Sequence, residues 1–199
     1  MWALIEDGSI TKLINNPRGM IIDDIQYSRN IFSLWSVEEK EAKGIYEVVF
    51  DNTNKKDEKY YNNTNQSFAF ADGVATASYG SAIANALADT LFTAQDEIDG
   101  KGTEGEVAVE GLKTKHKRII KQQASGLLTN YDWYVIRKAD AGTAVPSAIT
   151  TYRAAVRTKS GQMETAIDNA ANVDALAALY AYNDNDPPTR PLGEFPEAV

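Results

Sequence analysis

Adjacent carboxylates come closer to a catalytic pair than any other residues in this sequence. Asp23 and Asp24 are neighbours, and so are Glu38 and Glu39. Two carboxylates can share general acid and base work when a third group shifts the pKa of one of them. No such group is visible near either pair, and Glu38 and Glu39 follow Ser36 in the pattern of a capped first helical turn, where negative charge is favoured. The sequence therefore predicts no catalytic residues.

Metal-ligating and phosphate-binding patterns are also weak. The acids between residues 96 and 106 lack the alternating spacing of a calcium loop, and residues 183–186 alternate without the glycine and distal glutamate of such a loop. A solvated loop is the simpler interpretation for both. Gly100-Lys101-Gly102 lacks the full phosphate-loop pattern. The chain has no cysteine and one histidine, His116, which excludes cysteine zinc sites and sites built from two histidines. We expect no metal and no cofactor.

Charge argues against nucleic acid as a partner. The net charge is -8, from 28 acids and 20 bases, and an acidic chain repels phosphate backbones. One basic run, from Lys113 to Lys121, is explained most simply as a solvated helix face, with contact to an acidic partner surface as the alternative. The start of the chain is too short in apolar residues for a signal peptide, and no apolar run approaches a membrane helix, so we expect no membrane insertion.

The first 80 residues have the pattern of a β-rich domain. Asp7-Gly8 and Asp72-Gly73 each separate two apolar runs, which predicts hairpins with tight turns. Ser36 to Glu39 form a capping box that predicts a helix over Val37–Lys43, ended by Gly44 and followed by a strand over residues 45–50. We assign residues 1–80 to a docking or recognition domain.

The second half has a helical period. Residues 81–102 are expected to be a linker, in which Ala82–Leu91 could form a short helix, and residues 103–182 a helical domain that begins at the N-cap Thr103. Asp132–Ile136 is expected to be extended, and Pro146 to open another helix. A last helix over Val173–Tyr182 precedes an extended, proline-rich tail, residues 183–199. The fold class is therefore α+β.

One apolar stripe on the first long helix needs cover. It includes Leu112, Ile120 and Leu127, and only two shorter helices follow it in the chain. Copies of the same helix could supply the remaining cover, so the stripe predicts a homo-oligomer that associates through this helix. His116 lies on the edge of the stripe and is expected to be a partly exposed structural histidine, or to meet its own copies near a symmetry axis.

Two stretches resemble bacteriophage tail proteins. Residues 25–36, continued by Glu38-Glu39 and residues 42–45, are similar to an N-terminal module of small tail-fibre-associated proteins. The second resembles the C-terminal helical region of tail-fibre and tail-assembly proteins, where an LL, DW, P, YR, LR pattern links two helices. Its residues here are Leu127-Leu128, Asp132-Trp133, Val145-Pro146, Tyr152-Arg153 and Val156-Arg157. That family often ends in Trp-Pro, whereas this chain has Phe195-Pro196.

The resemblance implies a non-catalytic structural component of a bacteriophage tail. It would be a tail fibre, a fibre adaptor or a baseplate-associated attachment protein, made in the bacterial host cytoplasm and located in the tail of the virion. Its partners would be other tail proteins and its own copies, a trimer being favoured, with a host-surface receptor or glycan as a further partner. The alternatives are a fibre-assembly chaperone absent from the mature virion, and a glycan-cleaving tail enzyme, which would need a cleft with paired carboxylates.

The resemblance and the stripe together give the candidate interface residues. Asp132 is expected to anchor the turn between the helices, Trp133 to pack between them, and the residues of the YR and LR pairs to lie on successive turns of the second helix. The candidates are Leu112, His116, Ile119, Ile120, Leu127, Trp133, Tyr152, Arg153 and Arg157.

Overall fold

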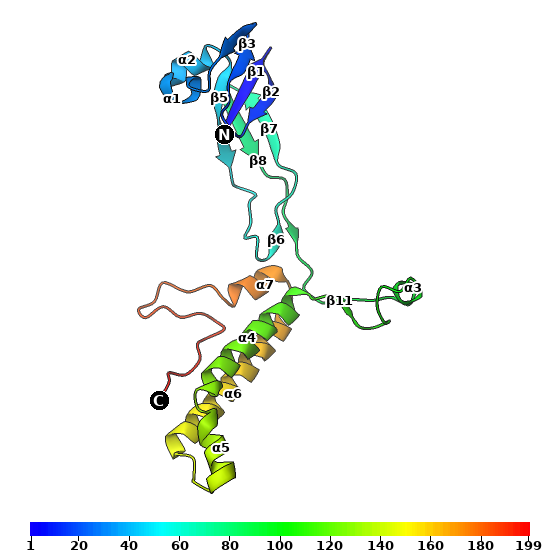
Figure 1. Ribbon diagram of the computed structural model, residues 1–199, viewed down its shortest axis with the longest axis vertical. Helices are drawn as coiled ribbons and strands as arrows, with labels where there is room; N and C mark the ends of the chain where they lie inside the picture. The colour runs from blue at the N-terminus through cyan, green and yellow to red at the C-terminus, as the bar shows by residue number, and fades with distance from the viewer. The chain divides into compact units, whose positions relative to one another are not determined.

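The computed structural model describes the whole chain, Met1–Val199, and confirms the α+β class. The chain divides into two compact units, Met1–Ile83 and Ala84–Val199. The first unit is built mainly of strands and the second mainly of helices (Figure 1). No helix is long and apolar enough to span a bilayer.

A curled five-stranded sheet forms the N-terminal unit. The strand order is β2-β1-β5-β8-β7, and every neighbouring pair is antiparallel except β5 and β8, which are parallel. The two edge strands, β2 and β7, also contact each other, so the sheet curls toward closure. The strands are β1 (Trp2–Glu6), β2 (Ser9–Ile14), β5 (Ile45–Asp51), β7 (Ser67–Ala71) and β8 (Val74–Ser78).

Both Asp-Gly hairpins predicted from the sequence are confirmed. Asp7 and Gly8 join β1 to β2, Asp72 and Gly73 join β7 to β8, and all four residues have positive φ, as tight primed turns require. Asp23 and Asp24 do the same between β3 (Met20–Ile22) and β4 (Ile25–Tyr27), with φ values of 49° and 58°. This pair of acids is thus the turn of a third hairpin.

The predicted capping box opens a short helix beside the sheet. The Ser36 hydroxyl accepts from the Glu39 N–H at 3.2 Å, and the Glu39 carboxylate accepts from the Ser36 N–H at 2.8 Å. The helix α2 (Val37–Glu41) ends two residues earlier than predicted, and Gly44 follows with a φ of +71°. A Cβ on Gly44 would collide with the carbonyl oxygen of Ile5, so this site needs glycine for two independent reasons.

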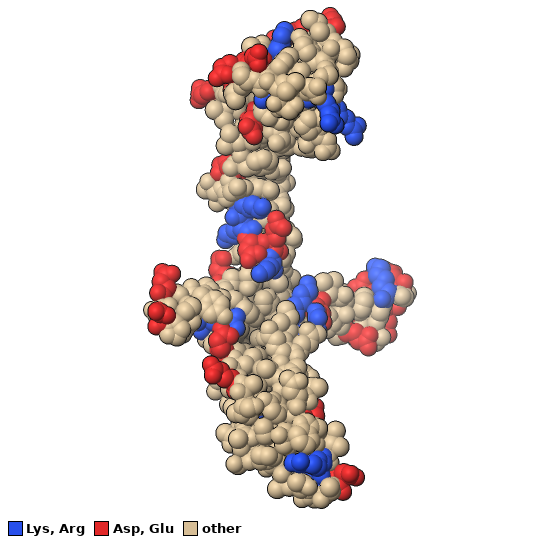
Figure 2. Space-filling view, turned by 60° about the vertical axis from the view of Figure 1, so that its left-hand side comes forward, with Lys and Arg blue, Asp and Glu red and all other residues tan.

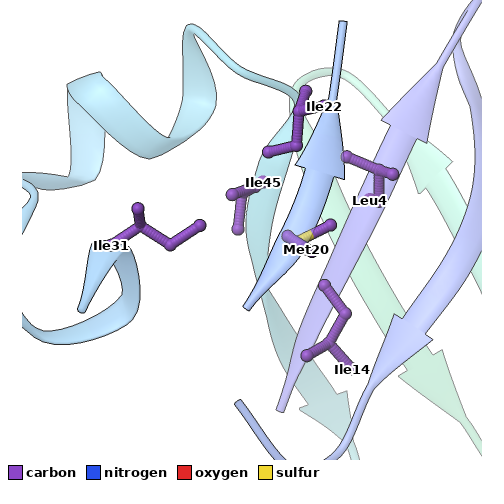
Figure 3. Packing of buried hydrophobic residues seen from close by; sticks show 6 residues of the cluster. All are labelled: Leu4, Ile14, Met20, Ile22, Ile31 and Ile45. Atoms are coloured by element: carbon purple, nitrogen blue, oxygen red, sulfur yellow. The ribbon is translucent and has the colours of Figure 1, made fainter. Parts of the chain in front are cut away.

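Period-two alternation in the strands divides the apolar side chains between two faces of the sheet. One face, with α1 (Ile31–Leu34) and the β3–β4 hairpin, encloses the cluster shown in Figure 3: Leu4, Ile14, Met20, Ile22, Ile31 and Ile45. The other face encloses a cluster of small residues, Ala3, Val48, Ala75 and Ala77, flanked by partly buried aromatic side chains. The short strands β6 (Tyr61–Asn62) and β9 (Ile83–Ala84) pair separately.

The C-terminal unit is organised around two long antiparallel helices, α4 and α6. Lys113 at the start of α4 meets Asp168 at the end of α6, and Arg153 near the start of α6 meets Leu128 at the end of α4. The elements are β10 (Thr90–Leu91), α3 (Ala94–Ile98), β11 (Val107–Val109), α4 (Leu112–Thr129), α5 (Asp132–Ala141), α6 (Ser147–Asn169) and α7 (Val173–Ala178).

Three local predictions for the second half are wrong. Ala82–Leu91 is not helical, because the Ala86 and Leu87 carbonyls accept from the first N–H groups of α4. The long helix begins at Leu112 and not at Thr103, because the intervening Val107–Val109 pairs with β10 as a strand. Asp132–Ile136 belongs to the helix α5 and is not extended. The helix expected at Pro146 is confirmed as α6, with Pro146 as its N-cap residue.

Candidate functional site

A buried arginine holds the junction of α4, α5 and α6. The guanidinium of Arg153 donates from Nη1 to the Leu128 carbonyl at 2.8 Å and pairs through Nη2 with Asp132 Oδ1, also at 2.8 Å. The Arg153 side chain is only 10% exposed, whereas Asp132 is half exposed. One side chain thereby adds a charged donor to a carbonyl at the end of α4, which also accepts from the Tyr131 N–H, and anchors the first turn of α5. Asp132, which the sequence analysis expected at this turn, is thus held there by Arg153.

Aromatic rings fill the space beneath this junction. Tyr152 is buried against Ala124, Val156 and Tyr131, with the Tyr131 and Tyr152 ring centroids 5.2 Å apart. Burial raises the pKa of Tyr152, and its hydroxyl has no hydrogen-bond partner. The YR pair of the resemblance is therefore part of the core of this unit.

The C-terminal tail folds back onto the same core. Leu192 is buried, and its N–H donates to the Leu179 carbonyl at 3.0 Å. Phe195 packs on the cluster beneath the junction, and the Tyr131 hydroxyl donates to the Val199 carbonyl at 2.7 Å. Part of the cover that the sequence interpretation sought in other subunits comes from the chain's own last residues.

The structure divides the nine candidate interface residues into three groups. Leu112, Ile120, Tyr152 and Arg153 are buried inside the unit, so a single copy does not present them on its surface. The cause is the cover given by α6, α7 and the returning tail, which the sequence pattern did not reveal. The half-buried members are His116, stacked against Tyr180, and Leu127, and the exposed members are Ile119, Trp133 and Arg157.

An exposed apolar and aromatic face lies on α5. Trp133 does not pack between helices; its side chain is 48% exposed and stacks on Tyr134, with ring centroids 3.8 Å apart. The Arg137 guanidinium lies 4.7 Å from the Trp133 ring centroid and holds this ring in place. Ile136, 67% exposed, lies three residues further on the same side of α5, whereas Val135, also exposed, lies on another side of the helix. We call Trp133 and Ile136 the α5 face.

A shallow, cation-lined groove adjoins the α5 face. Three neighbouring depressions of about 410, 360 and 310 Å³ share lining residues and run from Thr114 on α4 to Val145 before α6. Six of the lining side chains are basic and only Asp132 is acidic. We call these six the basic groove: Lys117, Arg118, Lys121, Lys138, Arg153 and Arg157.

Four of the groove cations have partners within the chain. Beside the Arg153 pair with Asp132, Lys117 pairs with Asp168, Arg118 with Glu110 and Lys121 with Glu164. The last three pairs are partly solvent-exposed, and ion pairs in contact with water contribute little to stability. The two remaining cations, Lys138 and Arg157, are exposed and make no ion pair or hydrogen bond. The basic run noted in the sequence is thus only partly neutralised by its own chain.

A hairpin that we call the α3 arm, residues 90–110, projects its apolar side chains into solvent. It consists of β10, α3 and β11, and a two-stranded ribbon of this size has no core of its own. Leu91, Val107 and Val109 are all exposed, and Ile98 in α3 is 78% exposed. The arm therefore presents apolar residues that no other part of the chain covers.

Hydrogen bonds within the arm hold its acidic tip in one conformation. Thr93 and Asp96 form a capping box at the start of α3, and Lys101 pairs with Asp96 at 3.1 Å and Asp99 at 3.0 Å. The N–H and hydroxyl of Thr93, followed by Lys101, lower the pKa of Asp96 to about 2. At the base of the arm, the Asp89 carboxylate accepts from the Gly111 N–H at 2.7 Å, which lowers the pKa of Asp89.

No group of three or more histidine, aspartate or glutamate side chains is placed to hold a metal ion. Among the acids of residues 96–106, Asp96, Glu97 and Asp99 instead accept hydrogen bonds or form ion pairs within the arm. Comparison with protein-family models, curated proteins and solved structures gave no match to this chain.

Proposed function

We propose that this protein is a non-catalytic structural component of a bacteriophage tail that works through contacts with other tail proteins and with its own copies. The observation that carries the proposal is the uncovered apolar surface of the C-terminal unit. The α3 arm and the α5 face expose large apolar side chains on ordered elements, whereas the rest of the unit covers its core. Such surfaces on a water-exposed protein are typical of protein-protein contact sites.

The sequence resemblance to tail proteins supports a bacteriophage tail as the place where this protein works. Of its C-terminal residues, Asp132, Tyr152 and Arg153 build the helix junction, and Trp133 is left on the surface. The junction orients α5 so that Trp133 and Ile136 face outward. Tryptophan is enriched among residues that dominate binding energy at protein interfaces, since it offers a large contact area at low conformational-entropy cost.

Mass spectrometry of purified virions tests the proposal. A structural component is expected at a stoichiometric ratio to the other tail proteins. A protein that is made during infection but is missing from the virion, or far below stoichiometric amounts, would be an assembly chaperone and would contradict the proposal.

A variant of the α5 face tests whether this surface is needed for incorporation into virions. Trp133→Ser with Ile136→Ser is expected to lower incorporation into virions by at least about tenfold, the loss typical of removing a central interface anchor. Ala139→Ser, on the exposed part of the same helix, is the matched control and should be incorporated normally. Circular dichroism of both proteins verifies that the helices are intact.

A further inference from the structure

We propose that the α3 arm of one copy docks in the basic groove of a second copy, so that subunits associate head to tail. This inference rests on one part of the proposed function, namely that copies of the protein associate with one another. It names the two surfaces that join the copies, and both surfaces lie in the C-terminal unit. The tail setting and the arm-groove contact are separate claims, and their tests give separate results.

Opposite charge is the first reason to pair these two surfaces. Residues 90–106 of the arm contain five acids and one base, a net charge of -4. Figure 2 shows acidic side chains gathered over this arm. The groove is lined by six cations and one acid, in a chain whose net charge is -8. Complementary potentials of this kind steer association and suppress wrong partners.

Apolar surface on both sides is the second reason. The arm exposes Leu91, Ile98 and Val107, which its own chain does not cover. Val135 on α5 lines the groove, and Ile136 on the same helix is exposed as well. A contact between these side chains would remove both apolar surfaces from water, which is the main favourable term in association. Charge would select the partner and apolar burial would hold it.

The arm is also ordered before it binds. The Thr93 capping box, the Lys101 ion pairs and the Phe92 ring packed against Gly102 hold the hairpin in one shape. Gly105 donates its N–H to the Phe92 carbonyl at 3.0 Å and closes the loop. A binding element that is already ordered loses little conformational entropy on docking. An arm of this kind is suited to insertion into a neighbouring subunit.

The tip of the arm does not occupy the groove of its own copy, since Ile98 is 78% exposed; only Glu110, at the base of the arm, reaches that groove, through its pair with Arg118. When each copy inserts its arm into one neighbour and receives the arm of another, the interface is heterologous. Repetition of such a contact produces a ring when the rotation from copy to copy brings the last copy back to the first. A closed ring leaves no arm free, and it agrees with the trimer that the resemblance favours.

Light scattering on the full-length protein tests the contact. The wild type is expected to show a multiple of the 21.8 kDa chain mass at micromolar concentration in low salt. Raising the salt to about 1 M should shift the mass toward the monomer, since exposed charges are then screened over about 3 Å. The arm variant Glu104→Lys with Glu106→Lys should weaken association by about tenfold or more. Neither side chain supports the arm by a hydrogen bond of its own, so the hairpin should remain folded.

A groove variant and a combined variant complete the design. Lys138→Glu with Arg157→Glu reverses the two groove cations that have no partner, and should weaken association to the same degree. The chain that carries the arm variant and the groove variant together has opposite charges again at these four positions, although residues 90–106 then have no net charge, so its mass should lie above that of either variant alone. Asp184→Lys with Glu197→Lys changes the net charge as the arm variant does, at two exposed acids outside the arm, and should leave the mass unchanged.

Three results would overturn the inference. The first is a monomeric wild type at every concentration and salt tested, the second an equal loss of association in the tail-charge control, and the third a combined variant whose mass is no higher than that of either variant alone. None of these results decides the proposed function, which mass spectrometry of virions tests separately, because a monomeric protein can still join a tail through other tail proteins. A protein absent from virions that nonetheless assembles by its arm would contradict the proposed function alone.

Discussion

Removing Arg153 should destabilise the C-terminal unit at the helix junction. Its guanidinium donates to the Leu128 carbonyl and the Asp132 carboxylate from a site that is 10% exposed. Breaking a buried ion pair costs about 3–5 kcal/mol, and a hydrogen bond to a charged group contributes about 1.5–3 kcal/mol. Because Asp132 is half exposed and regains water, we expect Arg153→Ala to lower the free energy of unfolding by about 2–3 kcal/mol.

Thermal unfolding is monitored through hydrogen exchange of the α4 and α6 amides, so that the loss of stability is measured for the C-terminal unit alone. A change of about 2–3 kcal/mol should lower the midpoint by roughly 8–12 °C for a unit of this size. Arg157→Ala, one turn further along α6, removes an exposed arginine without a partner and should change stability by less than about 0.5 kcal/mol. Arg153→Lys should lie between the two, since an ammonium group cannot form both bonds in the same fork. Equal effects of Arg153→Ala and Arg157→Ala would refute the assignment of the junction to Arg153.

Three further changes test the fold and the arm. Gly44→Ala should destabilise the N-terminal unit by about 2 kcal/mol or more, seen as faster exchange in β1 and β5, because a positive φ and a collision with the backbone of β1 both oppose it. The folded pKa of Asp96, about 2, lies below its ordinary value of 3.8, so its bonds to Thr93 stabilise α3 above about pH 4 and are lost as the pH falls toward 2. The helical circular dichroism of α3, in the wild type minus Asp96→Asn, should therefore decrease over that window. Ile167→Ala, at a fully buried site, should cost about 2–5 kcal/mol in a urea titration, and Ile136→Ala, at an exposed site, less than about 0.5 kcal/mol.

Features that depend on a few adjacent residues could be predicted from the sequence. The Asp7-Gly8 and Asp72-Gly73 turns and the Ser36 capping box are examples, because the conformations they need are set by local sterics and by hydrogen bonds within four residues. The β-rich first half and the helical second half follow from such local patterns and from the period of the apolar residues.

Features that depend on distant partners could not be predicted. The sequence pattern places Val107–Val109 in a helix, whereas the structure makes it a strand. Its pairing partner, β10, lies fifteen or more residues earlier, in a segment with no strand pattern. Asp132–Ile136 is rich in β-forming residues, yet Arg153, which lies 21 residues after Asp132, anchors it as the first turn of a helix. Tertiary contacts override local preference at both places.

The cover of the long helix shows the same limit and bears on function. The stripe was correctly identified as apolar, since Leu112 and Ile120 are buried, but its cover includes a returning tail that composition alone describes as extended. The uncovered apolar residues lie instead on the α3 arm and the α5 face. Any search for a partner should therefore begin from Ile98 and Trp133, and not from the stripe.

The residues of the tail-protein pattern have two different physical roles. Asp132, Tyr152 and Arg153 are accounted for by the helix junction that they build in this chain, so their presence needs no further explanation from function. Trp133 is not needed to cover the core, and its stacked, half-exposed ring gains a physical role only when another surface covers it. Substitutions at the junction lower the stability of the unit, so a loss of function in them does not separate the two roles weighed in the proposal. Substitutions at the half-exposed Trp133 are expected to leave the fold intact. Under the proposed function, the step at which a Trp133 variant fails would therefore distinguish a virion component from a chaperone.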